Sequence, residues 1–150
     1  MSSRLDDVMS ALVTTFTASS SLTGVDVRDG PPLDGVGDAD FVLVGHDGTP
    51  DSNADMTVEQ EWADLGCTSR YENGEVICAV VSQTGDTDLQ VRRDRAFTLL
   101  AACESALVAD RTLGGLVMSA QFVRGAARQF QNRNGSAVVA QFTVTYFAQV

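Results

Sequence analysis

The sequence EVICAVVSQ at residues 75–83, followed by TGDTD at 84–88 and LQVRRDRAFTLLAACESALVA at 89–109, decides the fold. The first stretch holds six consecutive apolar residues, several of them β-branched, which predicts a buried β-strand. In the last stretch, apolar residues recur at helical spacing: Leu89, Ala96, Leu99, Leu100, Cys103 and Leu107. Asp86 or Asp88 stands before this repeat, where a helix N-cap is expected. We therefore expect a long strand that turns directly into a helix with one buried stripe.

On the N-terminal side, the sequence predicts a further helix and three strands. The helix starts near Ser2 or Ser3, which we expect to cap it. It carries an apolar stripe at spacings of three and four: Leu5, Val8, Met9, Leu12, Val13 and Phe16. Strands are expected at 25–28 and at 41–45, and the second is apolar throughout, which is typical of a strand covered on both faces. Residues 56–63 alternate apolar and polar side chains, which predicts a strand with one polar face.

On the C-terminal side, the pattern predicts a hairpin. Residues 116–124 alternate, a loop rich in Gly, Arg, Gln and Asn follows at 125–135, and the longest strand returns at 137–148. Most connections between strands are too short for a crossover helix, so neighbouring strands should be antiparallel. The expected fold is α+β, with two helices packed on a mainly antiparallel sheet of about six strands, in a single domain over residues 1–150.

Charge and composition exclude two classes of protein. The chain has 150 residues, with ten arginines, no lysine and 20 acidic residues, for a formal net charge of −10. Such a chain lacks the excess of cations that non-specific nucleic-acid binding requires. No segment approaches the roughly 20 apolar residues of a membrane helix, so we expect no membrane partner. Three cysteines without a CxxC pair, and no apolar signal segment, indicate reduced thiols in a cytosol-like compartment.

The residues that commonly carry catalysis do not group in this sequence. The single histidine, His46, precedes Asp47 at the end of an expected strand, and no G-x-S-x-G elbow is present to supply a nucleophile. We interpret His46 as an exposed strand-end residue. The alternative is a small acidic enzyme that uses His46 and Asp47.

Metal and cofactor signatures are also incomplete. The loop around Asp51 and Asp55 begins like an EF-hand calcium loop but lacks its central glycine and final glutamate. Asp34, Asp38 and Asp40 are interpreted as ordinary loop residues rather than a cation site. No phosphate-binding glycine loop is present. We therefore expect no catalytic residue, metal or cofactor.

The sequence does offer surfaces for assembly. Long polar loops at 29–40, 47–55 and 125–135 project from a small sheet, and the polar face of the strand at 56–63 carries Glu59 and Glu61. Such edges and loops suit association into a larger object. A basic cluster is expected on the solvated side of the second helix, opposite its buried stripe: Arg92, Arg93 and Arg95.

An ordered series of segments runs along the chain. After the short N-terminal amphipathic helix come VDVRDGPP at 25–32, DFVLVG at 40–45, EW at 61–62, RYE at 70–72, IC at 77–78, SQTGDTD at 82–88, Arg95, Glu104, Asp110 and LGG at 113–115. In this order, the elements resemble the tail terminator proteins of long-tailed bacteriophages, particularly phages that infect high-GC actinobacteria. The resemblance covers nearly the whole chain, and its specificity lies in the ordered series rather than in one motif.

The resemblance implies a virion protein that is assembled in the host cytoplasm into a ring, usually of six subunits, at the head-proximal end of the tail. Such a ring binds the last ring of tail tube protein, stops polymerisation and presents a face to the head–tail connector (stopper) protein. It performs no catalysis, and genomic DNA passes through its channel without specific binding. The main alternative is another neck or head–tail connector ring protein.

Within such a ring, we expect rotational contacts that use sheet edges and strands near 56–63 and 136–148. The candidate subunit-interface residues are Glu59, Glu61, Arg92, Arg93 and Arg95. The candidate residues of loops on the axial faces are Asp34, Asp38, Asp51, Asp55, Arg128 and Gln131. Acidic loop residues would line the channel, where negative charge keeps DNA from adhering.

Overall fold

Two long antiparallel strands, β4 (Arg70–Thr84) and β6 (Gly135–Gln149), form the centre of the computed structural model. The structure describes residues 2–30, 39–48, 56–66, 68–132 and 135–150. β4 pairs with β6 from Tyr71 to Thr84, almost along its whole length. The backbone of Arg70 also exchanges two hydrogen bonds with that of Val150, of 2.8 and 2.9 Å, which joins the C-terminal residue to the start of β4.

Two shorter strands share the other edge of β4. The first half of β4 pairs with β3 (Met56–Trp62), and the second half pairs with β2 (Ala39–Val44). Beyond β2 lies β1 (Asp26–Asp29), and β5 (Ser119–Asn132) pairs with the far side of β6. The result is a six-stranded sheet of order β1-β2-β4-β6-β5, with β3 beside β4. All pairs are antiparallel except β1–β2. The expected α+β fold is confirmed.

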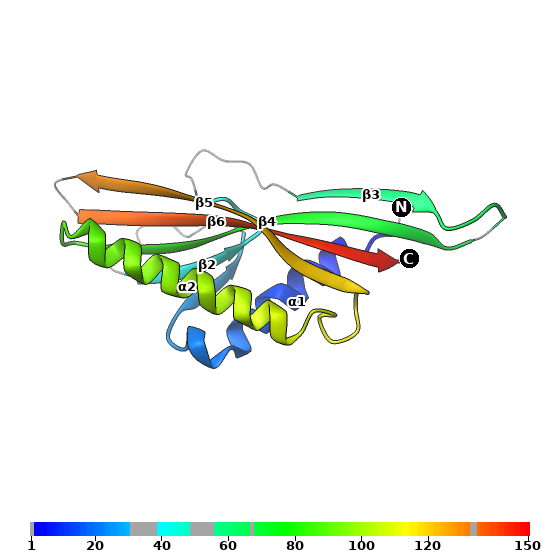
Figure 1. The fold of residues 1–150 in the computed structure, drawn as a ribbon, viewed down its shortest axis with the longest axis horizontal. Coiled ribbons are helices and arrows are strands. Elements are labelled where there is room, and N and C mark those ends of the chain that lie inside the picture. Colours follow the sequence, from blue (N-terminus) through cyan, green and yellow to red (C-terminus); the bar gives the residue numbers. More distant parts are fainter. Residues whose placement is uncertain (1, 31–38, 49–55, 67, 133–134) are drawn as a thin grey trace.

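Both long helices, α1 (Leu5–Ala18) and α2 (Leu89–Ala109), lie on one face of this sheet, with a short 3₁₀ turn, η1 (Ser20–Leu22), after α1 (Figure 1). The expected stripes face the sheet: Val8, Leu12 and Phe16 from α1, and Ala96, Leu99, Cys103 and Leu107 from α2, are all buried. Phe142 of β6 packs between Phe16 and Phe122, with ring centroids 6.1 and 5.1 Å away. This layer between helices and sheet is the main core.

The helix starts agree with the expected caps in part. Asp88 caps α2, where its Oδ1 accepts the Val91 N–H at 3.3 Å, and the Asp86 carboxylate accepts the Asp88 N–H at 2.9 Å. At α1 the N-cap position is Arg4, whose side chain makes no capping bond. The Ser3 hydroxyl instead accepts the Leu5 N–H at 3.0 Å, one residue before the cap position.

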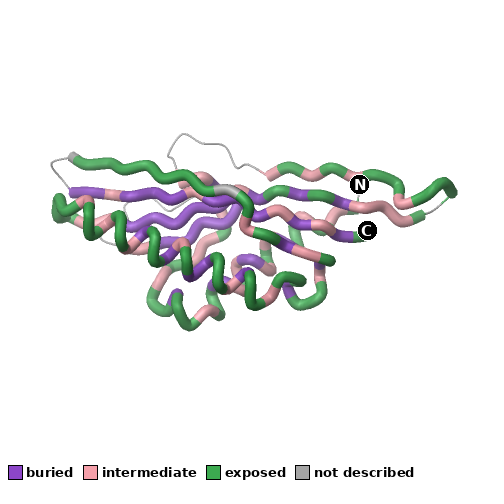
Figure 2. Tube along the Cα trace, in the orientation of Figure 1, coloured by how far each residue is buried: buried purple, intermediate pink, exposed green. Residues whose placement is uncertain are grey.

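A second, smaller core lies on the opposite face of the sheet. It contains Phe41, Leu43, Ala79, Val81 and Val139. The chain after β2 folds back across these residues at Gly48, where an added Cβ would lie 2.6 Å from Val139 Cγ1 and the backbone φ is +83°. Strand 41–45 is therefore covered on both faces, as its continuous apolar run predicts. Figure 2 shows the buried strands of this half of the sheet.

Two expectations about the C-terminal hairpin are wrong. Residues 125–132 were expected in a loop, but they extend β5 as far as Asn132. Gly125 and two alanines favour strands poorly, yet a continuous ladder with β6 holds them. A bulge between Phe122 and Arg124 shifts the register by one residue, and the new register continues to Asn132. β6 also lies inside the sheet, between β4 and β5, so residues 136–148 offer no free edge.

In the part of the chain that the structure describes, no helix is long and apolar enough to cross a membrane.

Candidate functional site

The β3–β4 hairpin forms an arm that extends beyond the helices, and one face of this arm is acidic. We define the arm as residues 56–66 and 68–76. Register places Thr57 opposite Glu75, Glu59 opposite Asn73 and Glu61 opposite Tyr71, so all three glutamates share the face that carries no helix. The side chains of Glu59, Glu61 and Glu75 are exposed, and none forms an ion pair with a described residue. This acidic face is where two of the candidate interface residues lie.

A shallow concavity of about 480 Å³ lies on the same side of the sheet. Its lining crosses four strands: Thr57, Glu59, Asn73, Glu75, Gln121, Thr145 and Phe147 contribute to it. Tyr71 and Phe147 pack against each other beside it, with ring centroids 5.3 Å apart. A polar, open hollow of this shape is better suited to a macromolecular contact than to an enclosed small ligand.

The opposite face of the arm holds a buried glutamate that the sequence analysis did not single out. Glu72 is fully buried and accepts hydrogen bonds from the Tyr146 hydroxyl at 2.7 Å, the Ser3 hydroxyl at 3.1 Å and the Arg4 N–H at 2.9 Å. Gln60 donates a further bond to its second oxygen. The carboxylate thus joins the start of α1 to β3, β4 and β6, close to the positive end of the helix dipole.

These contacts set the charge state of the cluster. Burial by itself would raise the pKa of Glu72, but the hydrogen bonds from Gln60, Tyr146, Arg4 and Ser3 outweigh it and lower the pKa below its usual value of 4.5. Burial also raises the pKa of the Tyr146 phenol, and the neighbouring carboxylate adds to the effect. Glu72 is therefore ionised and Tyr146 is a neutral donor at neutral pH. We interpret the cluster as a structural hydrogen-bond network that holds the arm against the start of α1.

The three arginines of α2 do not form the solvated cluster that was expected. Arg95 Nε donates to Asp40 Oδ2 at 2.8 Å, and Arg92 Nη1 donates to the Ser82 hydroxyl at 3.2 Å. Both side chains are half-buried, because positions 92 and 95 each lie four residues before a buried position of the helix. Arg93 is exposed and reaches Gln129 of β5 at 3.4 Å.

The remaining candidates lie on β5 or outside the described residues. Arg128 and Gln131 belong to a strand, not to the expected loop, and both are exposed. Gln131 Nε2 donates to the Thr87 carbonyl at 2.9 Å, whereas no ion pair of Arg128 is found among the described residues. Asp34, Asp38, Asp51 and Asp55, which were expected on the axial faces, lie outside the described residues.

The expectation that His46 is exposed is wrong. The side chain is 3% exposed, and its Nδ1 accepts the Gly48 N–H at 3.0 Å, so the ring braces the turn that covers the smaller core. Cys78 and Cys103 are buried free thiols, and burial raises the pKa of each to about 12. Within the described residues, no group of three or more His, Cys, Asp or Glu side chains is placed to hold a metal ion.

Comparisons with known proteins show a likeness to solved structures. No family model and no curated protein matches the chain. Among solved structures, the chain is similar to one described as "Virion of native gene transfer agent (GTA) particle", at 14% sequence identity and a TM-score of 0.46. The alignment covers 94% of this chain and 95% of that chain.

Proposed function

We propose that this protein is a structural component of a phage-like virion, a non-enzymatic ring that caps the head-proximal end of a tail tube. In this role it binds the last ring of tube protein, stops polymerisation and offers its other face to the head–tail connector. The ordered motif series and the expected fold of tail terminator proteins support the proposal. The ring would hold about six copies, as the resemblance implies.

The observation that carries the proposal is a pair of unpaired strands on opposite edges of one sheet. β3 pairs with β4 and β5 pairs with β6, and within the described residues neither pairs with another strand on its outer side, where the backbone of β5 makes only the Ala120 N–H bond to the Arg111 carbonyl at 2.7 Å. Unpaired strand edges are templates for contact with another chain. Two different edges on one subunit allow a head-to-tail contact, which closes into a ring when the rotation between copies is suitable.

The surroundings of His46 favour this proposal over the enzymatic alternative. A general base must reach its substrate, either directly or through one water molecule. The ring of His46 is buried, and its Nδ1 is already engaged by the Gly48 N–H. These contacts support a role in the turn rather than in catalysis.

The test is growth of tail tubes in vitro from purified tube protein of the same virus. With this protein added, we expect tubes that stop growing and carry a ring at one end in negative-stain images. Tubes that grow equally long with and without it would overturn the proposal. If a virus lacking the protein makes tails of normal length that fail to join heads, the protein is a neck connector instead.

A further inference from the structure

The charges of this chain are separated along the sequence. All 20 acidic residues lie within residues 1–110, whereas residues 111–150 contain four arginines and no acidic residue. The second segment contains both β5 and β6. The β5–β6 hairpin is therefore a basic element in a protein whose net charge is −10.

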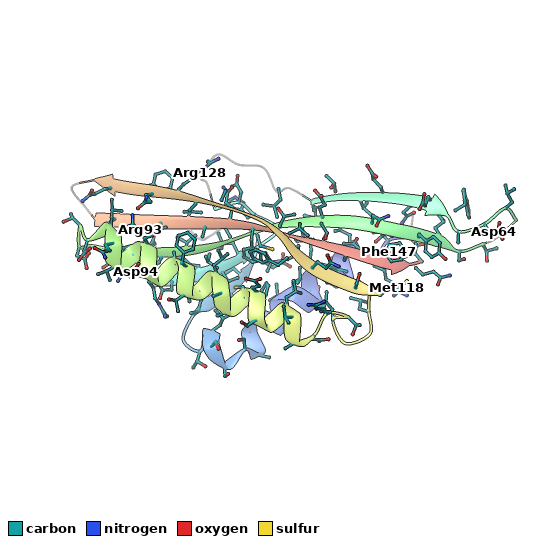
Figure 3. The ribbon with its side chains drawn as sticks, in the orientation of Figure 1. Asp64, Arg93, Asp94, Met118, Arg128 and Phe147 are labelled. Carbon is teal, nitrogen blue, oxygen red and sulfur yellow. The ribbon has the colours of Figure 1, made fainter. Side chains whose placement is uncertain are left out.

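In the folded chain the acidic face of the arm lies apart from Arg128 of β5, although the acidic turn at 84–88 contacts the end of β5 through the Gln131 bond to the Thr87 carbonyl. Figure 3 places Asp64, at the tip of the arm, and Arg128, on β5, toward opposite ends of the long axis. Arg128 lies opposite Val139 in the ladder, so it shares the helix-free face with the acidic side chains of the arm. Asp94, the exposed acid on α2 beside Arg93, lies on the other face of the sheet.

The negative charge on the acidic face of the arm is not balanced by an ion pair among the described residues. Glu59 and Glu61 are two positions apart on one strand, and Glu75 stands diagonally across from Glu59 on the next strand. Like charges at such positions repel and destabilise a sheet. No arginine among the described residues forms an ion pair with these three side chains. A cation from outside the chain would relieve this repulsion.

Both ends also expose apolar side chains that an interface could bury. Trp62 is 63% exposed and Leu65 is 100% exposed at the tip of the arm. On β5, Val123 is 49% exposed and Phe130 is 48% exposed. Figure 2 shows β5 as a long exposed run beside the buried β6. Exposed apolar residues beside charges of one sign are typical of a contact surface.

Building on the ring proposed above, we propose that neighbouring copies join head-to-tail, with the acidic helix-free face of one arm against β5 of the next copy. Glu59 and Glu61 of one subunit then face Arg128 of its neighbour. Charge complementarity selects the orientation and excludes arm-to-arm contact, which would place carboxylates together. Leu65 in the turn of the arm and Phe130 on the helix-free face of β5 supply apolar area to bury. Trp62 does not, because it pairs with Arg70 on the opposite face of the arm. The contact is heterologous, as a closed ring of more than two subunits requires.

Charge reversal tests this contact directly. Glu59→Arg with Glu61→Arg, and separately Arg128→Glu, should each weaken ring formation about tenfold or more at low salt, because each places like charges together. The combination of all three substitutions on one chain should restore rings. Asp94→Arg, which makes the same kind of reversal on the helical face, should leave ring formation unchanged. Rings are counted by native mass spectrometry and negative-stain imaging, with tube protein present. If the combined variant assembles no better than the separate ones, the proposed contact is wrong.

Cross-linking provides a second measurement that keeps the charges intact. Thr57→Cys and Ala126→Cys on one chain, with Cys67→Ser, should give a ladder of dimers, trimers and larger species with a flexible bis-maleimide. Each single cysteine variant should give no ladder, and Thr57→Cys with Asp94→Cys is the matched control. A ladder that is equally strong in the control would contradict the contact.

The two measurements separate this contact from the tail role. If the expected ladder forms but tubes grow without stopping, the head-to-tail contact stands and the proposed function fails. If tubes stop and carry rings while the charge swap shows no restoration, the function stands and the contact fails.

Discussion

Gly74 of β4 is the residue whose substitution tests the packing of the arm most sharply. It stands opposite Tyr146 in the β4–β6 ladder, and the tyrosine ring lies across it. A Cβ on Gly74 would overlap the ring, so Gly74→Ala must push Tyr146 aside. The displaced hydroxyl would then lose its 2.7 Å hydrogen bond to the buried carboxylate of Glu72.

The loss of stability in Gly74→Ala is the sum of the steric clash and the lost hydrogen bond. Overpacking a well-filled site costs about 1–3 kcal/mol, and a hydrogen bond to a charged group contributes about 1.5–3 kcal/mol. Gly74→Ala should therefore lower the free energy of unfolding by roughly 2.5–6 kcal/mol, a large share of the 5–15 kcal/mol typical of a domain. Tyr146→Phe removes the hydroxyl alone and should cost about 1.5–3 kcal/mol.

Urea unfolding followed by circular dichroism measures these free energies, and a double-mutant cycle isolates the clash. In a Tyr146→Ala background the ring is absent, so Gly74→Ala should cost less than about 1 kcal/mol. Gly125→Ala is the control: its Cβ meets only the Gln141 carbonyl at 3.6 Å, and we expect a change within about 0.5 kcal/mol. An equal loss of unfolding free energy for Gly74→Ala with and without the tyrosine ring would exclude the clash with Tyr146.

Three further predictions concern the buried groups. Because the folded state lowers the pKa of Glu72, ionisation of this residue stabilises the fold above pH 4.5, its usual pKa, and this contribution is lost as pH falls through the lower folded value. The difference in unfolding free energy between wild type and Glu72→Gln, measured by urea titration, should therefore shrink as the pH falls below 4.5. A difference that grows on acidification would contradict this prediction. Cys78 and Cys103, with pKa values of about 12, should resist a maleimide at pH 7 until the protein unfolds, as peptide mass spectrometry will show; rapid labelling of either in the native protein would exclude their burial. Leu99→Ala should lower the free energy of unfolding by about 2–5 kcal/mol because Leu99 is fully buried. Val91→Ala, at a position that is 46% exposed, should lower it far less. Equal losses of the two variants in urea unfolding would argue against the proposed core.

The hydrophobic pattern was sufficient to predict the layers of the fold. The stripes of both helices and the apolar run at 41–45 are buried as their spacing indicates, because burying those surfaces drives folding. The end of β5 could not be predicted in the same way. Residues 125–131 are exposed on both faces, so no alternation distinguishes them from a loop, and only the ladder with β6 keeps them extended.

The candidate site was predicted less completely. Glu59 and Glu61 lie on an exposed face, as period two predicts, but their role as interface residues stays a prediction. Arg92 and Arg95 were assigned to the wrong side of the helix, although their spacing from Ala96 and Leu99 already pointed toward the sheet. Glu72 was missed, yet a signal existed: it continues the buried alternation of β4, where a charged side chain requires several donors. His46 was misjudged because the fold-back at Gly48 depends on tertiary contacts.

We propose that this protein ends the growth of a tail tube. The distribution of tail lengths tests this role, measured by electron microscopy of particles assembled without the protein beside particles assembled with it. We expect overlong tails of variable length when the protein is missing and uniform tails when it is restored. Tails of one normal length in its absence would contradict this role.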